Sequence, residues 1–182
     1  TVYRGTPVPQ AVQDYTLVLK GHIRVATAVF PEGTKGYQID TMARDEMWRQ
    51  GIDFGHGTGH GVGFFLCVHE GPARISPFPA DVKLEKGMLL TNEPGIYRDG
   101  SHGIRLENMI LVEAAFENEF GGFLKFRNMT WCHFEKDLID KKMLTKIEIE
   151  WLNHYHQKVY EKLSPVLDAK ISGWLKNKTA PL

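Results

Sequence analysis

The stretch from Phe54 to Glu70, which reads FGHGTGHGVGFFLCVHE, limits what this chain can fold into more than any other part. It contains five glycines and three histidines: His56, His60 and His69. So many glycines disfavour a helix, so we expect these histidines on turns or short strands. Two later carboxylates, Glu93 in TNEPG and Glu107 in IRLEN, adjoin apolar runs. We predict that the histidines and carboxylates form one site.

Length and charge limit the number of domains and the classes of partner. The 182 residues suffice for one domain with its own core. Lys+Arg and Asp+Glu both number 22, which argues against a nucleic-acid or membrane-surface partner recruited by bulk charge. No apolar run approaches the ~18 residues of a membrane helix, and we find no signal-peptide pattern. Cys67 and Cys132 make no disulfide framework, so we expect small buried thiols in a cytoplasmic protein.

The apolar periodicity predicts the element order α-α-β-β-β-β-α-α. We expect helices over residues 10–30, from Gly36 to Gly51, over 145–162 and from Pro165 to about Trp174. The second helix has an inward stripe of Ile39, Met42, Ala43 and Met47, and Thr145 with Glu148 forms a capping box before the third. We expect strands over 63–68, 88–91, 96–97, 104–112 and 123–134, the last at a sheet edge.

The remaining segments are predicted to be loops, namely 74–81, 113–122 and a frayed tail after 174. Arg98-Asp99-Gly100 reads as a hairpin turn. The strand at 104–112 alternates poorly, so we expect it to be buried on both faces. The order of elements predicts an α+β domain in which helices pack on a mainly antiparallel sheet.

The two glutamates point to a bound cation. A carboxylate inside an apolar strand such as IRLENMILV is costly unless it is paired or binds a cation, and Glu93 after MLLTN is in a similar position. Together with His60, Glu93 and Glu107 form a hard donor set. This set suits Mn, Co or Zn better than a thiolate-type structural zinc site.

Other interpretations remain open for the same residues. A histidine in a loop is more often structural than a ligand. Arg105 is two residues from Glu107 on one predicted strand, so both side chains point the same way. Arg105 is therefore either a neutralising partner of Glu107 or a support for a metal ligand. The glycines of HGTGHG also fit a turn or an anion-binding loop, although the GxxxxGK[ST] pattern of a phosphate loop is absent.

Four motifs, in this order, resemble the C-terminal catalytic half of the pita-bread metallopeptidases: HGTGHGVG, VHEGP, LLTNEPGIY and GIRLENMILV. Within them the chain is most similar to the Xaa-Pro aminopeptidases (aminopeptidase P). The resemblance runs from Thr1 to about Ser172 and includes LKGHI, FPEGTKG and WLNHYH. It implies half or more of a pita-bread (creatinase/aminopeptidase) fold, with helices on a mainly antiparallel curved sheet and a helical extension over about 145–175.

The resemblance also implies a role for each carboxylate and for the central histidine. His60, Glu93 and Glu107 are metal ligands. Glu93 is in addition placed as the general base for the attacking water, and Glu107 bridges two metal ions. The implied cofactor is a pair of divalent ions, with Mn preferred and Zn or Co as alternatives. Two such ions can bind one hydroxide between them and make a nucleophile at neutral pH.

The other site residues are implied to face the substrate or to support the ligands. His56 and His69 line the substrate pocket and donate hydrogen bonds to the developing oxyanion or to the peptide backbone. Arg105 supports a ligating carboxylate. The activity implied is removal of the N-terminal residue from peptides with proline in second position, by a hydrolase of the cytoplasm that forms a homodimer.

The family's two-metal site includes residues that have no counterpart here. Its two aspartates occur in a motif like DSGxQYxxGTTD and just before a TRT-like segment, and a further histidine comes from the first half of the domain. Thr1-Val2 resembles the pair directly after the second aspartate, whereas Asp14 and Asp40 lie on predicted helices.

We therefore expect residues 1–182 to be the C-terminal part of the catalytic domain. By itself this part should be metal-free or bind metal weakly, should be inactive, and should need the remainder of the domain. It should also expose a strand edge and an apolar face, which favour self-association.

Two competing functions follow from the same motifs. Some pita-bread domains have lost their metals and serve as binding modules, but His60, Glu93 and Glu107 are all present here. A sister peptidase, a prolidase or a methionine aminopeptidase, would share the ligands. WLNHYH and the spacing from HGTGHGVG to VHEGP favour aminopeptidase P.

Overall fold

The computed structural model describes residues 5–182, which fall into two compact units. One unit combines the N-terminal residues through Thr16 with Trp131–Leu182, and the other is Leu17–Thr130. Helix α1 (Pro9–Ala26) is continuous from the first unit into the second. The prediction that Thr1-Val2 corresponds to the pair directly after the family's second aspartate concerns residues outside the described range.

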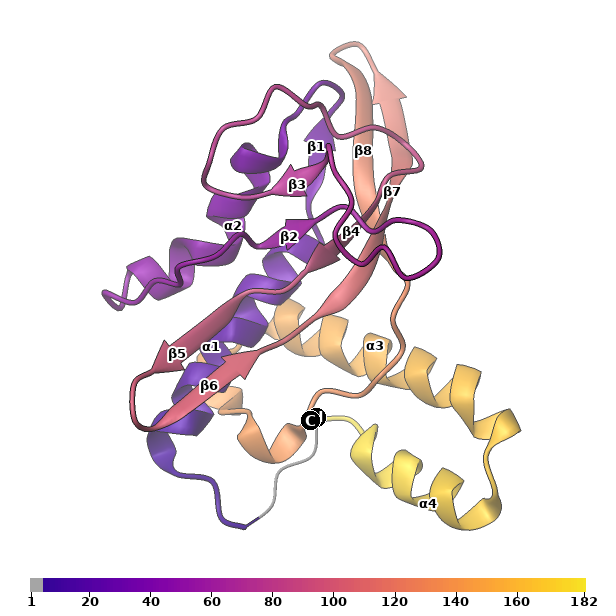
Figure 1. Cartoon of the computed structure of the whole chain (residues 1–182). Coiled ribbons are helices and arrows are strands. Elements are labelled where there is room, and N and C mark those ends of the chain that lie inside the picture. The colour runs from indigo at the N-terminus through magenta and orange to yellow at the C-terminus, as the bar shows by residue number, and fades with distance from the viewer. Residues whose placement is uncertain (1–4) are drawn as a thin grey trace. The chain divides into compact units, whose positions relative to one another are not determined.

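The second unit is built around a four-stranded antiparallel sheet with the order β1-β8-β7-β4 (Figure 1). Its strands are β1 (Val29–Pro31), β4 (Leu89–Asn92), β7 (Asn108–Asn118) and β8 (Gly121–Asn128). Two further antiparallel pairs are β2 (Gly59–His60) with β3 (Arg74–Ile75), and β5 (Gly95–Arg98) with β6 (His102–Arg105). The predicted α+β fold with a mainly antiparallel sheet is confirmed.

Two helices of this unit flank the strands. Helix α1 is bonded to strand ends, because His22 Nδ1 donates to the Leu106 carbonyl at 3.2 Å and Asn92 Nδ2 donates to the His22 carbonyl at 2.9 Å. Helix α2 (Gly36–Trp48) buries Ile39, Ala43 and Met47 as predicted. Met42 is 37% exposed, so its inward placement was wrong.

Helix α1 ends at Ala26, four residues before the predicted end. The Thr27 hydroxyl donates to the Ile23 carbonyl at 2.8 Å and satisfies an acceptor of the last turn. Val29 and Phe30, which were assigned to the helix, instead pair with Lys125 and Leu124 of β8. β-Branched and aromatic residues suit a strand better than a helix end.

The strand predicted over residues 63–68 is absent. Phe65 and Leu66 have φ angles of 50° and 68°, and residues in this left-handed region cannot continue a β-ladder. The nearest strand is instead β2 (Gly59–His60). Its partner is β3 (Arg74–Ile75), inside the segment 74–81 that was predicted to be a loop.

The strand predicted over 104–112 is two strands separated by Leu106 and Glu107. Glu107 is therefore not in a strand interior; it is exposed and lies between the two strands, next to the buried Leu106. β7 is buried on one face only, since Ile110 and Val112 are buried whereas Met109 is 38% exposed. The alternation was hidden because aliphatic residues occupy both faces of this strand.

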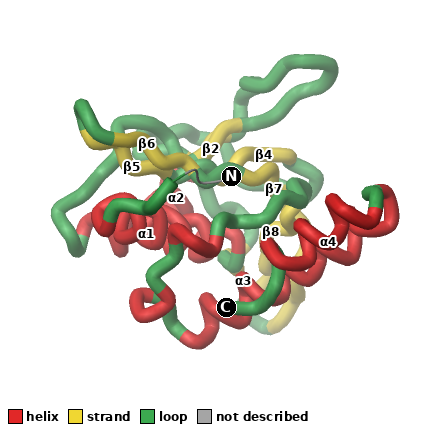
Figure 2. The backbone as a smooth tube through the Cα atoms, turned by 90° about the horizontal axis from the view of Figure 1, so that it is seen from below, coloured by secondary structure: helices red, strands yellow, loops and turns green. Residues whose placement is uncertain are grey.

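Strands β7 and β8 form a long hairpin that replaces the loop predicted over 113–122 (Figure 1). β8 ends at Asn128 rather than at 134, and it lies between β1 and β7 instead of at an edge. The predicted hairpin turn at Arg98–Gly100 is confirmed by the pairing of β5 with β6, which Figure 2 shows side by side.

Helices α3 and α4 belong to the first unit and pack against each other (Figure 2). α3 (Lys146–Leu163) begins with the predicted capping box of Thr145 and Glu148. α4 (Ala169–Lys178) begins four residues after Pro165, which lies in a short 3-10 helix (Ser164–Val166). Two more 3-10 turns precede α3, Lys136–Leu138 and Lys141–Met143.

The C-terminal tail is bonded rather than frayed. The backbone N–H of Leu182 donates to Asn153 Oδ1 at 2.9 Å, and Lys136 Nζ donates to the Ala180 carbonyl at 2.7 Å. Cys67 and Cys132 are exposed, which corrects the prediction that both are buried. None of the described helices combines the length and apolar character needed to cross a membrane.

Candidate metal centre

A hollow of about 340 Å³ in the second unit brings together five of the six residues predicted to form the site. They come from the glycine-rich stretch, from the end of β4 and from β6: His56, His60, His69, Glu93 and Arg105. Segments that are far apart in the sequence thus meet at one place. Glu107 is the sixth predicted residue and does not line the hollow.

The glycine-rich stretch lies close to β4 because Gly59 has no side chain. A Cβ at Gly59 would overlap the Thr91 carbonyl. Two hydrogen bonds then fix the approach, from the Glu93 N–H to the Thr58 carbonyl at 2.7 Å and from the His60 N–H to Thr91 Oγ1 at 3.0 Å. His60 and Glu93 are therefore held side by side by backbone geometry.

The His60 ring presents a lone pair to a carboxylate. His60 Nδ1 lies 2.9 Å from the Gly61 carbonyl, and Nε2 lies 3.1 Å from Glu93 Oε1. A carbonyl oxygen can only accept, so Nδ1 carries the proton and a neutral ring has its lone pair on Nε2. The lone pair then faces a carboxylate oxygen, which also only accepts. Such a pair needs a positive centre between its atoms, either a proton or a metal ion.

The spacing of this pair fits a divalent cation. Ligand atoms at ~2.1 Å from one metal and at right angles to each other lie about 3 Å apart, which matches the 3.1 Å between His60 Nε2 and Glu93 Oε1. Thr91 Oγ1 donates to Glu93 Oε1 at 2.9 Å and orients the carboxylate. A hydrogen bond that orients a ligating group is a usual part of a metal site.

Glu107 belongs to the same electrostatic group although it lies outside the hollow. Partial burial raises the pKa of Glu107, and the charge of Glu93 raises it further, while Arg105, His60 and His69 act in the opposite direction. Among residues 5–182, no three His, Cys, Asp or Glu side chains come together closely enough to hold a metal ion. Of the three predicted ligands, His60 and Glu93 are thus in direct contact, and Glu107 acts on them through its charge.

A hydrogen-bonded series leads from His56 to Glu93. His56 Nδ1 is 2.7 Å from the Gly57 carbonyl and therefore carries a proton, so Nε2 accepts from the Tyr97 hydroxyl at 2.8 Å. Arg105 Nε donates to the same hydroxyl at 2.9 Å, and Arg105 Nη1 lies 3.7 Å from Glu93 Oε2. The series orients both His56 and the carboxylate face that His60 does not contact.

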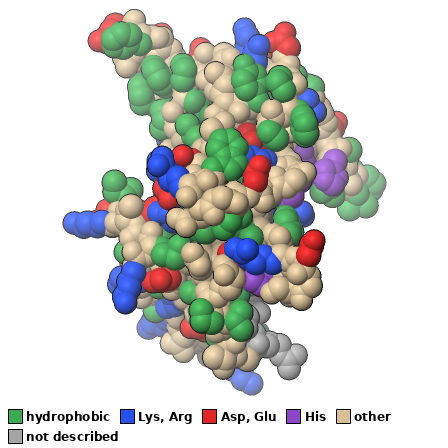
Figure 3. Space-filling model, turned by 90° about the vertical axis from the view of Figure 1, so that its left-hand side faces the viewer, with side chains coloured by type: hydrophobic (Ala, Val, Ile, Leu, Met, Phe, Trp, Pro, Cys, Tyr) green, Lys and Arg blue, Asp and Glu red, His purple; other side chains and the backbone are tan. Residues whose placement is uncertain are grey.

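His69 is exposed and lies beside His60, with 4.1 Å between the two ring centroids. It ends an exposed loop whose tip is apolar, with Phe64 90% and Leu66 91% exposed. In Figure 3 a group of hydrophobic side chains projects beside histidine side chains. His69 is thus open to a ligand that enters the hollow.

Reasoning from the sequence missed Tyr97 and Thr91. The hairpin register was the available signal for Tyr97, because Gly95 pairs with Arg105 and Tyr97 with Gly103, which makes Tyr97 and Arg105 diagonal neighbours. A Cβ at Gly95 would lie 2.7 Å from the Tyr97 hydroxyl, so this glycine makes room for the ring. No pattern distinguished Thr91, whose role depends on the approach of β2.

The profile described as metallopeptidase family M24 matches residues 1–114, and one for the C-terminal region of M24 peptidases matches residues 122–182. A probable Xaa-Pro aminopeptidase P of Coprinopsis cinerea is 49% identical over the whole chain. This chain covers 30% of that relative's length.

Two solved structures resemble this chain. The X-prolyl aminopeptidase of Caenorhabditis elegans, described as a cytosolic enzyme with a di-nuclear active site, matches with a TM-score of 0.93 and 38% identity. The match extends over 100% of this chain and over 30% of the C. elegans chain. A dipeptidase of Pyrococcus horikoshii matches with a TM-score of 0.58 and 35% identity. That match extends over 74% of this chain and over 34% of the dipeptidase chain. The match to the pita-bread aminopeptidase P fold confirms the predicted architecture.

Proposed function

Because this chain belongs to metallopeptidase family M24, we propose that the protein carrying it removes the N-terminal residue from peptides with proline in second position. The observation that carries the proposal is the pair of acceptors, His60 Nε2 and Glu93 Oε1, facing each other at 3.1 Å in a hollow. A cation is the simplest partner for both. The preference for proline is supported by relatives that are named for it.

His60, Glu93 and Glu107 are the residues of this chain that would hold the metal. Two divalent ions, with Mn preferred over Zn or Co, would supply a hydroxide nucleophile at neutral pH. Further ligands come from the remainder of the catalytic domain, in keeping with a chain that spans about 30% of its relatives. The isolated 182 residues are accordingly inactive and bind metal weakly.

Glu93 is the proton carrier of the proposed reaction. Its Oε1 faces His60 and accepts from Thr91, while Oε2 faces Arg105. Glu93 takes the proton of the attacking water and delivers it to the prolyl nitrogen, which must be protonated to leave. Arg105 keeps the carboxylate oriented through both steps.

His56 and His69 contact the peptide in this proposal. His69 is the exposed donor and stabilises the negative charge that develops on the carbonyl oxygen. His56 is fixed by Tyr97 and binds the peptide backbone. We further propose that the protein acts in the cytoplasm, as its C. elegans relative is described to do, and that it is a homodimer.

The test uses the longer protein, supplied with Mn²⁺ and offered a tripeptide with proline second or an Xaa-Pro dipeptide, with products separated by chromatography. We expect release of the first residue from the tripeptide and a loss of at least ~100-fold in Glu93→Gln. Cleavage of the dipeptide alone would identify a prolidase. Cleavage of neither substrate would favour a metal-free binding module and would overturn the proposal.

A further inference from the structure

Helix α2 carries a buried ion pair that the proposed chemistry does not use. Asp40 and Arg44 are one turn apart, and both side chains are 2% exposed. Arg44 Nε donates to Asp40 Oδ2 at 2.6 Å. Both residues lie on the face that buries Ile39, Ala43 and Met47. A charged pair inside an apolar stripe is costly to bury unless its remaining donors and acceptors are satisfied.

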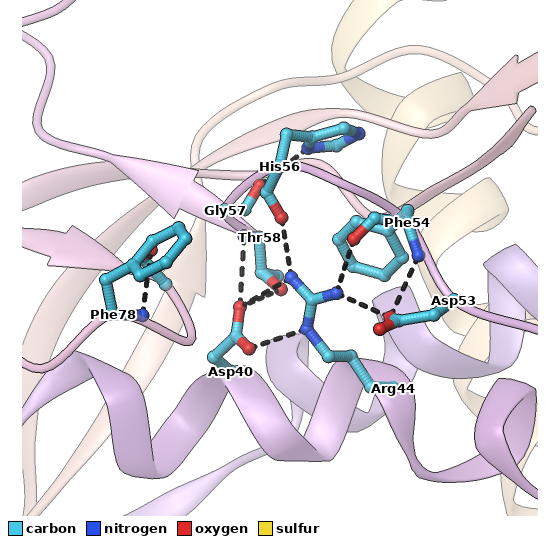
Figure 4. Close-up of polar contacts among 9 residues, drawn as sticks. Asp40, Arg44, Asp53, Phe54, His56, Gly57, Thr58 and Phe78 are labelled. Atoms are coloured by element: carbon cyan, nitrogen blue, oxygen red, sulfur yellow. Dashed lines mark hydrogen bonds and ion pairs between the residues drawn. The ribbon is translucent and has the colours of Figure 1, made fainter.

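The two terminal nitrogens of Arg44 both bind the backbone of one segment (Figure 4). Arg44 Nη1 donates to the Phe54 carbonyl at 2.7 Å, and Nη2 donates to the His56 carbonyl at 2.5 Å. The guanidinium carbon also lies 3.8 Å from the centroid of the Phe54 ring. Asp53 accepts a further bond from Nη1 at 2.7 Å. One side chain thus fixes the chain on both sides of Gly55.

Asp40 fixes the far end of the same segment. Its Oδ1 accepts from the Thr58 hydroxyl at 2.7 Å and from the Thr58 N–H at 3.2 Å. Thr58 is fully buried, and its carbonyl accepts from the Glu93 N–H at 2.7 Å. A continuous set of bonds therefore runs from α2 through Thr58 to the backbone of Glu93.

Residues 54–58 need such bonds because the segment has little order of its own. Its sequence is FGHGT, and glycines lose more conformational entropy on folding than other residues. His56 makes its side-chain bonds to Gly57 and Tyr97, which can form only if the backbone places its ring correctly. His60 differs, since its bonds go to Gly61, Thr91 and Glu93.

We infer that the Asp40–Arg44 pair is a positioning device for His56 in the peptidase reaction. The pair holds the backbone of residues 54–58 so that the His56 ring meets Tyr97 at the edge of the hollow. The inference rests on the proposed function for its catalytic consequence. It concerns His56, because the His60 N–H and Glu93 Oε1 are also bonded to Thr91.

Hydrophobic residues of similar size can replace many buried ion pairs without loss of stability. Stability alone therefore does not explain why this position carries an ion pair, and positioning of the backbone does. What hydrophobic residues cannot replace is a planar group that donates to two carbonyls and two carboxylates at once. Lysine keeps the charge and can pair with Asp40, but it cannot reach both carbonyls in the same geometry. Arg44→Lys is thus the variant that separates positioning from charge.

The experiment compares Arg44→Lys and Thr58→Val with Arg49→Lys in the longer protein. Arg49 is exposed at the C-cap of α2 and pairs with Asp45, so Arg49→Lys is the matched control. Thr58→Val removes the hydroxyl bond to Asp40 but leaves the ion pair intact. This variant keeps the inference testable even if Arg44→Lys does not fold. Amide hydrogen exchange, histidine NMR signals, metal content and tripeptide kinetics are measured.

We expect amide exchange of residues 56–58 to rise at least ~10-fold in Arg44→Lys, less in Thr58→Val, and not at all in Arg49→Lys. The imidazole signals of His56 should shift while those of His60 and the metal content stay as in the wild type. The kcat should fall by ~10–100-fold, since a small displacement of a catalytic group is costly. Unchanged exchange and unchanged His56 signals would overturn the inference.

The two proposals fail separately. A wild-type protein that cleaves no tripeptide contradicts the proposed function, whereas hydrogen exchange and the His56 signals still decide whether the pair positions this segment. Conversely, an active wild type whose Arg44→Lys variant keeps normal exchange and normal kcat contradicts the positioning role alone.

Discussion

Residues 54–58 and residues 64–68 belong to one glycine-rich stretch, but they differ in how the protein holds them. In the first segment Phe54 is 5% exposed and Thr58 is fully buried, and side chains of α2 bind its backbone. In the second, Phe64 and Leu66 are about nine-tenths exposed. Its backbone bonds stay local, from Cys67 N–H to the Phe64 carbonyl for example.

The difference shows that hydrophobicity did not decide which segment is buried. FFL is more apolar than GHG, yet residues 54–58 are better held, because Arg44 binds the Phe54 and His56 carbonyls and Asp40 binds Thr58. The Phe64–Leu66 tip takes positive φ at Phe65, which directs its side chains away from the unit. We therefore assign the chemistry to the first segment and its neighbours, and no role in holding the site to the tip.

Among the charged residues, the largest effect is expected from the removal of Arg44. Arg44→Met should lower the free energy of unfolding by ~3–5 kcal/mol, because it leaves the Asp40 carboxylate buried without its partner. Arg49→Met should lower it by less than ~0.5 kcal/mol, since Arg49 and Asp45 are exposed. Denaturant titration of the longer protein measures both, and equal effects would contradict the comparison.

A second test uses pH. Burial lowers the pKa of His22 to about 4, although hydrogen bonding to Leu106 opposes the shift. Between pH 6.5 and about 4 the unfolded chain takes up a proton that the folded one does not, so stability falls as pH falls. The expected contribution is about 3 kcal/mol.

His22→Gln, which can still donate to Leu106 but does not titrate, should reduce the pH dependence over this range. Denaturation midpoints at pH 7 and pH 4.5 measure the difference. A variant with the full wild-type slope would show that His22 is not buried as described.

Thr91 tests the support of the site itself. Thr91→Val removes the donor to Glu93 Oε1 and the acceptor of the His60 N–H, and the residue is 2% exposed. Leaving buried polar groups unsatisfied should cost ~1–3 kcal/mol. Thr41→Val, on the exposed face of α2, is the control and should change little. Thermal unfolding of the two variants gives the comparison.

The smallest effect is expected at the exposed tip. Phe64→Ser should change the free energy of unfolding by no more than ~0.5 kcal/mol, because Phe64 is 90% exposed. Phe54→Ser, its matched variant in the buried segment, should cost ~3–5 kcal/mol. Size-exclusion chromatography should also show less self-association in Phe64→Ser. If both variants lost a similar free energy of unfolding, the proposed difference between the two segments would be wrong.

The sequence predicted which residues lie together better than it predicted the strands. Motif order identified His56, His60, His69, Glu93 and Arg105, and these meet in one hollow. The strand expected over 63–68 failed because the φ angle of Phe65 depends on the loop closure and leaves no mark on an apolar run. Glu107 was placed inside a strand because the break at Leu106 has no glycine or proline to reveal it.

The role of Asp40 and Arg44 was also beyond the sequence. Asp40 was considered only as a metal ligand and set aside because it lies on a helix, where the structure indeed has it. The spacing of Asp40 and Arg44 indicates an i,i+4 pair. Their bonds to residues 54–58 depend on tertiary packing that no local pattern encodes.

The central claim is that the His60–Glu93 edge is part of a metal centre, and metal content tests it most directly. The longer protein, its Glu93→Gln variant and its Phe64→Ser variant are dialysed against Mn²⁺ and analysed by mass spectrometry. We expect about two metal ions per chain in the wild type and in Phe64→Ser, and less than half of that in Glu93→Gln. Glu93→Gln with the metal content of the wild type would contradict the account.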